Sequence, residues 1–488
     1  MDTQRNADMP LSREAIVEGL QRIVGPEDVI TDEQILIQSS VDNFRKLQNI
    51  FDVHTMPMPA AVVMARSTEK VVEILRFADE HGVNVIPRTG ATATEGGLES
   101  AVPDSVILDG SAMNEIVSID AYNMQATAQC GVPLQVLEDR VRELGLTTGH
   151  SPQSKPVAHM GGLVATRSIG QFSTLYGGIE DMVVGLEAVF PGGQVTRIKN
   201  VPRRAAGPDI RHVVVGNEGA LCFITEVTVK LFPYFPENNV FLGWTLKDMK
   251  TGFEVLRDVV VNGYKPSVAR VYDPGDAGIH FSHFAAKDDC VLLFMAEGPA
   301  GIAKATADGI QAIVDKHREC TQVPSEYIET WFNDLCWAPD KITAEDERIR
   351  QTHNVNRTTE ISADWGHIND IYQAARARII EEIPDITMMG GHSSHSYING
   401  TNMYFNYFFN VVGVGPEEET TKYYLPIISI ICEETLKRGG SIVHHHGMGK
   451  ARAPWVKDEY GSSYYILETL KRSFDPQDIM NKGTIFPK

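Results

Sequence analysis

Apolar residues near the start of the chain recur every three or four positions, the spacing that places them on one face of an α-helix. From Leu11 to about Val24, these positions are Ile16, Leu20 and Ile23. Ser12 stands where a side-chain oxygen can cap the first turn. The pattern predicts an amphipathic helix at the beginning of the fold.

A second helix is predicted over residues 67–82, between two apolar runs that are typical of buried strands. Gly82 is expected to end it, because glycine readily takes the left-handed conformation of a helix terminus. The two runs are AAVVMA (60–65) and VNVIP (83–87). The apolar face of the helix consists of Val71, Ile74, Leu75 and Ala78. Strand, helix and strand in this order predict a βαβ unit.

Further strands are predicted at SVILD (105–109) and QATAQC (125–130), followed by a helix from Pro133. Residues 181–198 alternate between apolar and other positions and read as a β-hairpin with its turn at Pro191-Gly192-Gly193. The apolar positions of one parity are Met182, Val184, Leu186, Ala188 and Phe190. This parity predicts that one face of the hairpin is buried.

From about residue 237 the pattern changes to longer strands mixed with longer helices. The clearest helices cover residues 367–382 and 423–440, and strands are predicted within residues 239–246, 290–297 and 401–412. These features are typical of an antiparallel sheet with helices beside it. We therefore predict an α+β protein with four parts: an N-terminal helical segment (1–54), a first domain (55–236), a second domain (237–440) and a C-terminal segment (441–488).

Composition narrows the function classes. The chain of 488 residues carries 44 Lys+Arg against 64 Asp+Glu, a formal charge of −20. This charge argues against nucleic acid or an anionic membrane surface as a partner, and an anionic substrate would need a local basic pocket. Six scattered cysteines without a CxxC pair indicate reduced thiols. Neither a signal peptide nor a membrane span is visible, so we expect a cytoplasmic protein.

Two glycine-rich loops follow predicted strands, at residues 87–100 and 159–178. Small residues let main-chain N–H groups approach an anion closely, as around a pyrophosphate. A long turn is the alternative interpretation of the first loop alone. The GxGxxG and Walker A motifs are absent. Two such loops on one domain favour a large phosphate-bearing cofactor.

Five segments in order carry a family resemblance. They are PRTGATATEGG (87–97), TTGHSPQS (147–154), GGLVATRSIG (161–170), LYGGIEDMVVGLEAVFPGG (175–193) and GNEGALCFITEVTVKLFP (216–233). This order resembles the PCMH-type FAD-binding domain of the vanillyl-alcohol oxidase / p-cresol methylhydroxylase superfamily. In detail the chain is most similar to alkyldihydroxyacetone-phosphate synthase and to bacterial FAD-linked oxidoreductases, from about residue 55 to the end.

The resemblance implies a two-subdomain FAD-binding domain, an α+β cap domain with an antiparallel sheet, and a C-terminal segment that returns to the flavin. It implies FAD contacts at Pro87, Arg88, Thr89, Gly90, Ala91, Thr92, His150, Ser151, Met160, Gly161, Thr166, Ser168, Glu218, Gly219, Ile224 and Asn481. Many members of the superfamily attach FAD through a histidine in the first loop. Thr92 stands at that position here, so the resemblance implies non-covalent FAD.

In the cap domain, the resemblance assigns an anion-binding role to Arg270 and a catalytic role to Tyr404. A guanidinium suits a carboxylate or phosphate, although a surface salt bridge is the alternative interpretation. A phenol needs nearby positive charge or donors to act as a base at neutral pH. We expect the histidines to supply them, and we interpret Tyr397, Tyr407 and Phe408 as core residues.

Two cap histidines, His392 and His395, are expected to contact the substrate. The synthase has an arginine at the place of His392. Because histidine is a weaker anion anchor and a better proton handler, this difference puts the synthase activity in doubt. Related D-2-hydroxy acid dehydrogenases bind a divalent metal at similar positions. We predict no metal here; the alternative ligand set would be His392, His395, His445 and His446.

The segment SIVHHHGMGK (441–450) contains three consecutive histidines after the helix stop at Gly439-Gly440. We predict an extended strand, in which His444 and His446 share one face and His445 points to the other. The segment should form a wall of the flavin site. His445 and His446 would be catalytic proton handlers, and His444 and Lys450 would contact the substrate.

These residues favour a flavin-dependent dehydrogenase or oxidase that acts on a D-2-hydroxy acid or a sugar-derived alcohol. The alternative is the synthase-type transfer, which has no net redox change. A flavin-binding protein without catalysis is a third class, which the converging polar residues disfavour. The electron acceptor stays open between oxygen, a quinone and an electron-transferring flavoprotein. By the resemblance, we expect a homodimer.

Overall fold

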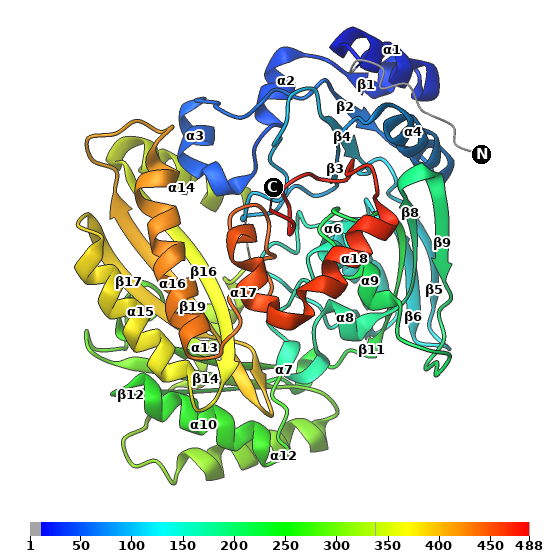
Figure 1. The fold of residues 1–488 in the computed structure, drawn as a ribbon. Coiled ribbons are helices and arrows are strands. Elements are labelled where there is room, and N and C mark those ends of the chain that lie inside the picture. The colour runs from blue at the N-terminus through cyan, green and yellow to red at the C-terminus, as the bar shows by residue number, and fades with distance from the viewer. Residues whose placement is uncertain (1–10, 337, 488) are drawn as a thin grey trace.

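The structure is a computed structural model that describes residues 11–336 and 338–487. Figure 1 shows two halves, with the end of the chain, in red, running between them. The predicted N-terminal helix is confirmed as α1 (Arg13–Val24), and the Ser12 hydroxyl accepts a hydrogen bond from the Ala15 N–H as its cap. Among the described residues, no helix is both long and apolar enough to span a bilayer.

A four-stranded sheet with helix α4 (Thr68–His81) beside it opens the first half. In spatial order its strands are β1 (Val29–Ile30), β2 (Ala61–Met64), β4 (Val106–Asp109) and β3 (Val85–Arg88). The predicted βαβ connection is confirmed, and β4 lies between its two strands and parallel to both. Helix α4 ends at Gly82, whose φ of 67° is left-handed, as predicted.

The second sheet of this half is five-stranded and antiparallel. Its spatial order is β5 (Ile116–Asp120), β6 (Gln125–Gln129), β10 (Phe223–Lys230), β8 (Val183–Phe190) and β9 (Gln194–Ile198). The hairpin β8–β9 is confirmed, but the expectation of one buried face is wrong because all of β8 is buried. Leu186 and Ala188 pack into one core, whereas Val189 packs with α4 into another. The sheet is therefore covered on both faces.

The cap half is built on one antiparallel sheet, as predicted. Along the sheet the strands are β15 (Thr321–Val323), β12 (Val240–Leu246), β14 (Cys290–Ala296), β13 (Val268–Tyr272), β17 (Ile386–Ser393), β19 (Gly400–Asn410) and β16 (Asn354–Asp364), with β18 (Ser396–Tyr397) paired to β19. Helices α10 (Met249–Val261), α12 (Ala300–Val314), α15 (Ile368–Glu382) and α16 (Leu425–Lys437) share one large core with this sheet. The last two confirm the predicted helices.

Strand alternation divides the residues of β19 between the two faces of the cap sheet. Met403 and Phe405 lie in the core shared with the helices, so Tyr404 between them points to the other face. Tyr407 lies in that core too, as expected. The cap sheet thus presents a polar face toward the first half and the C-terminal segment.

Short helices and one small sheet complete the structure. They are α2 (Glu33–Gln38), α3 (Lys46–Phe51), α5 (Leu134–Arg142), α6 (Met160–Ala165), α7 (Ser173–Tyr176), α8 (Ile179–Met182), α9 (Arg211–Val214), α11 (Pro274–His280), α13 (Ser325–Asn333), α14 (Pro339–Thr352), α17 (Val456–Tyr460), α18 (Tyr464–Phe474) and the pair β7 (Leu146–Thr147) and β11 (Phe232–Pro233). The helix predicted from Pro133 is α5. All six cysteines are unpaired thiols.

Candidate active site

Arg270 projects from β13 on the polar face of the cap sheet. Only 5 % of it is exposed, and its guanidinium donates to the Tyr272 hydroxyl at 2.9 Å and lies 5.1 Å from the ring centre of Trp331. Its Nε–H has no partner, and within the described residues no carboxylate forms an ion pair with it. A buried, unpaired cation is costly, so this site favours an anion.

His392 on β17 is held by a carboxylate that the sequence did not point to. Its Nδ1 lies 2.6 Å from Oδ2 of Asp276, to which Asn406 also donates at 2.9 Å. The imidazole stacks on the ring of Tyr404, with 4.5 Å between ring centres. Burial lowers the pKa of His392, and the Asp276 carboxylate only partly opposes this. A neutral imidazole is a poor anion anchor, consistent with the expectation for this residue.

Tyr404 is hydrogen-bonded to the histidine triplet. Its hydroxyl lies 2.6 Å from Nε2 of His445. Burial raises the pKa of Tyr404, and the nearby Glu360 carboxylate raises it further. Burial also lowers the pKa of His444 to about 4 and that of His445 well below the usual histidine value. Burial therefore disfavours the charged form of these two histidines, and the contact that the structure gives Tyr404 is the hydrogen bond with His445. The expected role of the histidines beside Tyr404 stays a prediction.

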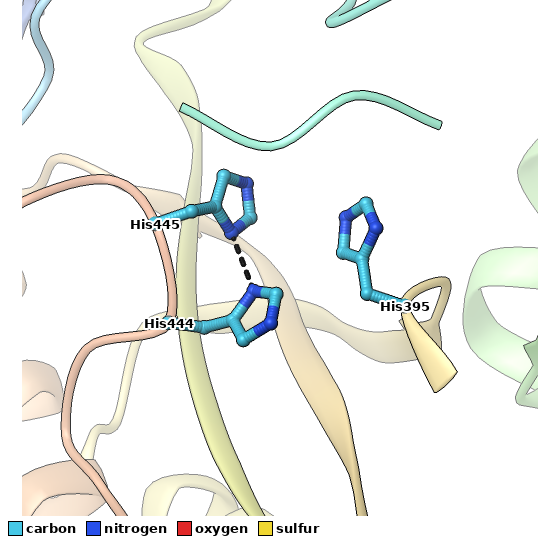
Figure 2. Close-up of side chains that lie close together, drawn as sticks. All are labelled: His395, His444 and His445. Carbon is cyan, nitrogen blue, oxygen red and sulfur yellow. Dashed lines mark hydrogen bonds between the residues drawn. The ribbon is translucent and has the colours of Figure 1, made fainter. Parts of the chain in front are cut away.

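The triplet is not an extended strand, which corrects the sequence-based expectation. The carboxylate of Glu360 on β16 accepts the backbone N–H of His444 at 2.5 Å and that of His446 at 2.8 Å. Because the N–H groups of His444 and His446 converge on the same carboxylate, the backbone between them is bent and not extended. As a result the rings of His444 and His445 lie on the same side, with their Nδ1 atoms 2.8 Å apart, across from His395 (Figure 2).

A buried ion network joins three distant segments behind the triplet. The Arg452 guanidinium donates to Glu95 of the first glycine-rich loop at 3.0 Å and to the Glu360 main-chain carbonyl at 3.1 Å. Burial opposes ionisation of Glu360, but Arg452 and the backbone N–H of His446 hold its pKa below the usual value. Sequence reasoning missed all three residues, because no local pattern marks them. The network fixes the triplet against the cap and the loop.

In the first glycine-rich loop, the backbone packs closely against neighbouring segments at the residues predicted to bind FAD. A Cβ at Gly90 would lie 2.6 Å from the Val157 carbonyl oxygen, and Ala91 has a left-handed φ of 52°. Pro87 packs against Gly219, and Thr92 lies in the irregular part of the loop. The Nε–H of Arg88 donates to Asp109 at 2.8 Å, and the role of Arg88 toward the pyrophosphate stays a prediction.

The second group of predicted cofactor residues is partly bound to other protein groups. Nε2 of His150 lies 3.1 Å from the Ser168 hydroxyl, Ser151 accepts from Gln171, and the Thr166 hydroxyl donates to the Gly162 carbonyl. Met160 and Gly161 begin α6, and Ile224 is a core residue of β10. These roles stay predictions.

Three residues that were predicted to contact FAD or the substrate, Glu218, Lys450 and Asn481, hold the C-terminal segment in place. The Glu218 carboxylate accepts the N–H groups of Met448 and Gly449 at 2.7 and 2.8 Å. The Lys450 ammonium donates to Asn481 at 2.9 Å and to the Gly97 carbonyl at 3.2 Å. These charged groups therefore bond the protein itself, and their expected roles toward the adenine-ribose side and the substrate stay predictions.

Three buried polar atoms beside the two glycine-rich loops have no hydrogen-bond partner among the described residues. They are Oγ1 of Thr89, Nδ1 of His150 and Nδ1 of His159. Each such atom costs free energy unless a ligand or water pairs with it. A dinucleotide cofactor rich in oxygen and nitrogen atoms fits this lining, and Thr89, His150 and His159 would bond it.

Burial of neutral His150 makes stability depend on pH. Burial lowers the pKa of His150 to about 4, against an unfolded value near 6.5. As the pH falls, His150 is therefore protonated in the unfolded chain at a higher pH than in the folded protein. Its contribution to the free energy of unfolding is complete above pH 6.5 and is lost as the pH falls toward 4. Between pH 7 and 5, wild type should lose about 2 kcal/mol more unfolding free energy than His150→Gln, whose amide can still reach Ser168.

Urea denaturation of both proteins at the two pH values measures this difference. Equal losses in the two proteins would mean that His150 is not kept neutral by burial.

Two family models match this chain. Residues 59–199 match the FAD binding domain family, and residues 235–485, more than half of the chain, match the C-terminal domain of FAD linked oxidases. The chain belongs to the family of FAD-linked oxidases. This confirms the predicted family and FAD as its cofactor.

The relatives of this chain include an uncharacterised oxidoreductase, a synthase and an oxidase subunit. An uncharacterised FAD-linked oxidoreductase, YgcU, of Escherichia coli K12 is 62 % identical over 482 residues, covering 98 % of this chain and 99 % of that protein. Alkyldihydroxyacetonephosphate synthase of Dictyostelium discoideum is 26 % identical, covering 88 % and 73 %. Glycolate oxidase subunit GlcD of Bacillus subtilis is 26 % identical, covering 97 % of each.

A solved structure extends the comparison to the fold. p-Cresol methylhydroxylase with bound substrate superposes with a TM-score of 0.73 at 18 % identity, covering 97 % of each chain. The predicted α+β, PCMH-type fold is thereby confirmed.

Proposed function

We propose that this FAD-linked oxidase oxidises a small, hydroxyl-bearing substrate with an anionic end, such as a D-2-hydroxy acid or a sugar-derived acid. The observation that carries the proposal is Arg270, a buried cation to which the described residues give no counter-ion. It lies on the sheet face that also carries Tyr404 and His392. Membership of this family and similarity to YgcU, which is named as an FAD-linked oxidoreductase, support oxidoreduction as the reaction type.

The proposed roles of the chain's residues follow from their contacts. Arg270 binds the substrate carboxylate through two N–H groups. The substrate hydroxyl contacts the Tyr404 hydroxyl, and its proton passes to the hydrogen-bonded pair of Tyr404 and His445. His446 closes the site beside Tyr404, with 5.8 Å between ring centres. When bound, FAD supplies the acceptor for the hydride and its two electrons.

Reduction of the flavin by substrate tests this function. The anaerobic protein is mixed with a panel of D-2-hydroxy acids, aldonates and polyols, and the flavin absorbance is followed. Each acid is paired with its neutral counterpart, which lacks the carboxylate. Bleaching by an acid and not by its neutral counterpart supports the proposal. Exchange of fatty acid on acyl-dihydroxyacetone phosphate, without bleaching by any alcohol, would support the synthase-type transfer instead.

We also propose that FAD is bound without a covalent link. Thr92 has no imidazole nitrogen with which to form the bond that the resemblance describes. Acid precipitation of the holoprotein should therefore leave the yellow flavin in the supernatant. A yellow pellet after repeated washing would contradict this prediction.

A further inference from the structure

Tyr397 on β18 is not the core residue that its sequence suggests. Its hydroxyl lies 2.7 Å from Nε2 of His444. The other ring nitrogen of His444, Nδ1, lies 2.8 Å from Nδ1 of His445 (Figure 2), and Nε2 of His445 lies 2.6 Å from the Tyr404 hydroxyl. Three hydrogen bonds thus join four side chains in one unbroken line from the candidate active site.

One assignment of protons satisfies all three hydrogen bonds, with each group donating to the next from Tyr404 toward Tyr397. A neutral imidazole has one N–H donor and one acceptor nitrogen. If Tyr404 donates to Nε2 of His445, the proton of His445 is on Nδ1 and is donated to Nδ1 of His444. His444 then carries its proton on Nε2 and donates it to Tyr397. The depressed pKa values of both histidines agree with neutral rings.

The far end of this line lies near the molecular surface. Ile398, the residue after Tyr397, is 67 % exposed. Burial raises the pKa of Tyr397, and the carboxylates of Glu180 and Asp181 raise it further, which places them close by. Glu180 pairs at 3.1 Å with Arg167, whose side chain is 49 % exposed. A proton that reaches Tyr397 is therefore close to water.

We propose that His444 and Tyr397 form the outlet of a proton relay that carries the proton of the substrate hydroxyl from Tyr404 through His445 to solvent. The relay rests on the proposed function. The substrate loses a hydride, with two electrons, to FAD and one proton to Tyr404. Each group then passes its own proton to the next, and Tyr397 releases one to water. No group in the line changes its net charge when the transfer is complete.

A metal ion is the competing explanation of this cluster. Ring nitrogens of His395, His444 and His445 all lie within 4.8 Å of one another. Two imidazole nitrogens bound to one tetrahedral ion at about 2.0–2.1 Å would lie roughly 3.3 Å apart. The two Nδ1 atoms here are 2.8 Å apart, a hydrogen-bond distance. The geometry therefore favours the hydrogen bond. His392 and His446 are not part of the cluster, which corrects the alternative ligand set named from sequence.

Tyr397→Phe tests the outlet because it removes one hydroxyl and keeps the ring. The rate of flavin reduction by substrate should fall on the order of 10- to 100-fold, with FAD content and substrate affinity unchanged. The solvent deuterium isotope effect should rise, because proton departure becomes rate-limiting. Tyr407→Phe is the matched control: its buried hydroxyl bonds Thr359 at 2.9 Å on the other face of the same sheet. Its rate should stay as in wild type.

If the flavin of Tyr397→Phe were reduced by substrate as fast as the flavin of the wild-type protein, the relay would be overturned and the proposed function would remain intact. A test that needs no substrate is ¹⁵N NMR of histidine-labelled holoprotein. The relay requires His444 and His445 to carry their protons on different ring nitrogens, one on Nδ1 and the other on Nε2. The same tautomer in both rings, or a stoichiometric metal found by elemental analysis and lost in His444→Gln, would overturn it.

Discussion

Replacing Arg270 with methionine should lower kcat/KM for the anionic substrate by roughly 10²- to 10³-fold and leave FAD binding unchanged. The reason is that the guanidinium is a buried cation on this face of the cap sheet and has no counter-ion in the described part of the chain. Loss of one partner from a buried charge pair costs about 2–5 kcal/mol of binding. Steady-state kinetics with the acid identified in the substrate panel measure the effect.

The same substitution should not destabilise the substrate-free protein. Removing an unpaired buried charge relieves its desolvation cost, so the melting temperature should stay the same or rise. Arg357→Met is the contrasting control, because Arg357 pairs with the buried Glu419 at 3.0 Å and its loss leaves that carboxylate alone. That variant should melt at a lower temperature. Unchanged kcat/KM in Arg270→Met would remove Arg270 from the site.

Replacing Tyr404 with phenylalanine should slow flavin reduction by about 10²- to 10⁴-fold, the usual contribution of a positioned proton-transfer group. The hydroxyl lies 2.6 Å from His445, and the ring stacks on His392, so the substitution removes the proton contact and keeps the packing. Rapid mixing of the anaerobic holoprotein with substrate measures the rate constant at saturation.

Tyr407→Phe serves here too, because Tyr407 is on the same strand and points into the opposite core. A loss of the same size in both variants would indicate a general disturbance of β19. A wild-type rate in Tyr404→Phe would mean that the substrate proton leaves by another group.

Much of the scaffold could be predicted from the sequence, since its signals are local. Helical spacing with Ser12 and Gly82 as boundary residues located α1 and α4, and short apolar runs located the strands around them. The prediction for β8 was wrong in one respect. Its alternation suggested one buried face, whereas two cores cover both faces, and nothing within the strand records what packs on it.

The candidate site was only partly predictable. Arg270, Tyr404 and the histidines were found through a family resemblance in which motifs stay in register. Asp276, Glu95 and Glu360 were missed, because nothing in the local sequence distinguishes a buried acidic residue from one on the surface unless its partner is known. Tyr397 was assigned to the core for the same reason: an aromatic residue in a strand has no local mark that distinguishes packing from hydrogen bonding.

The histidine triplet separates the two kinds of information. The sequence by itself determined that three imidazoles follow a helix stop and precede glycines that allow a tight turn. Which way the rings point was decided by Glu360, 84 residues before His444, whose buried carboxylate binds two backbone N–H groups and bends the segment. Because a buried charge must be paired, and its partners come together only when the chain has folded, the tertiary structure alone aligned Tyr404, His445, His444 and Tyr397.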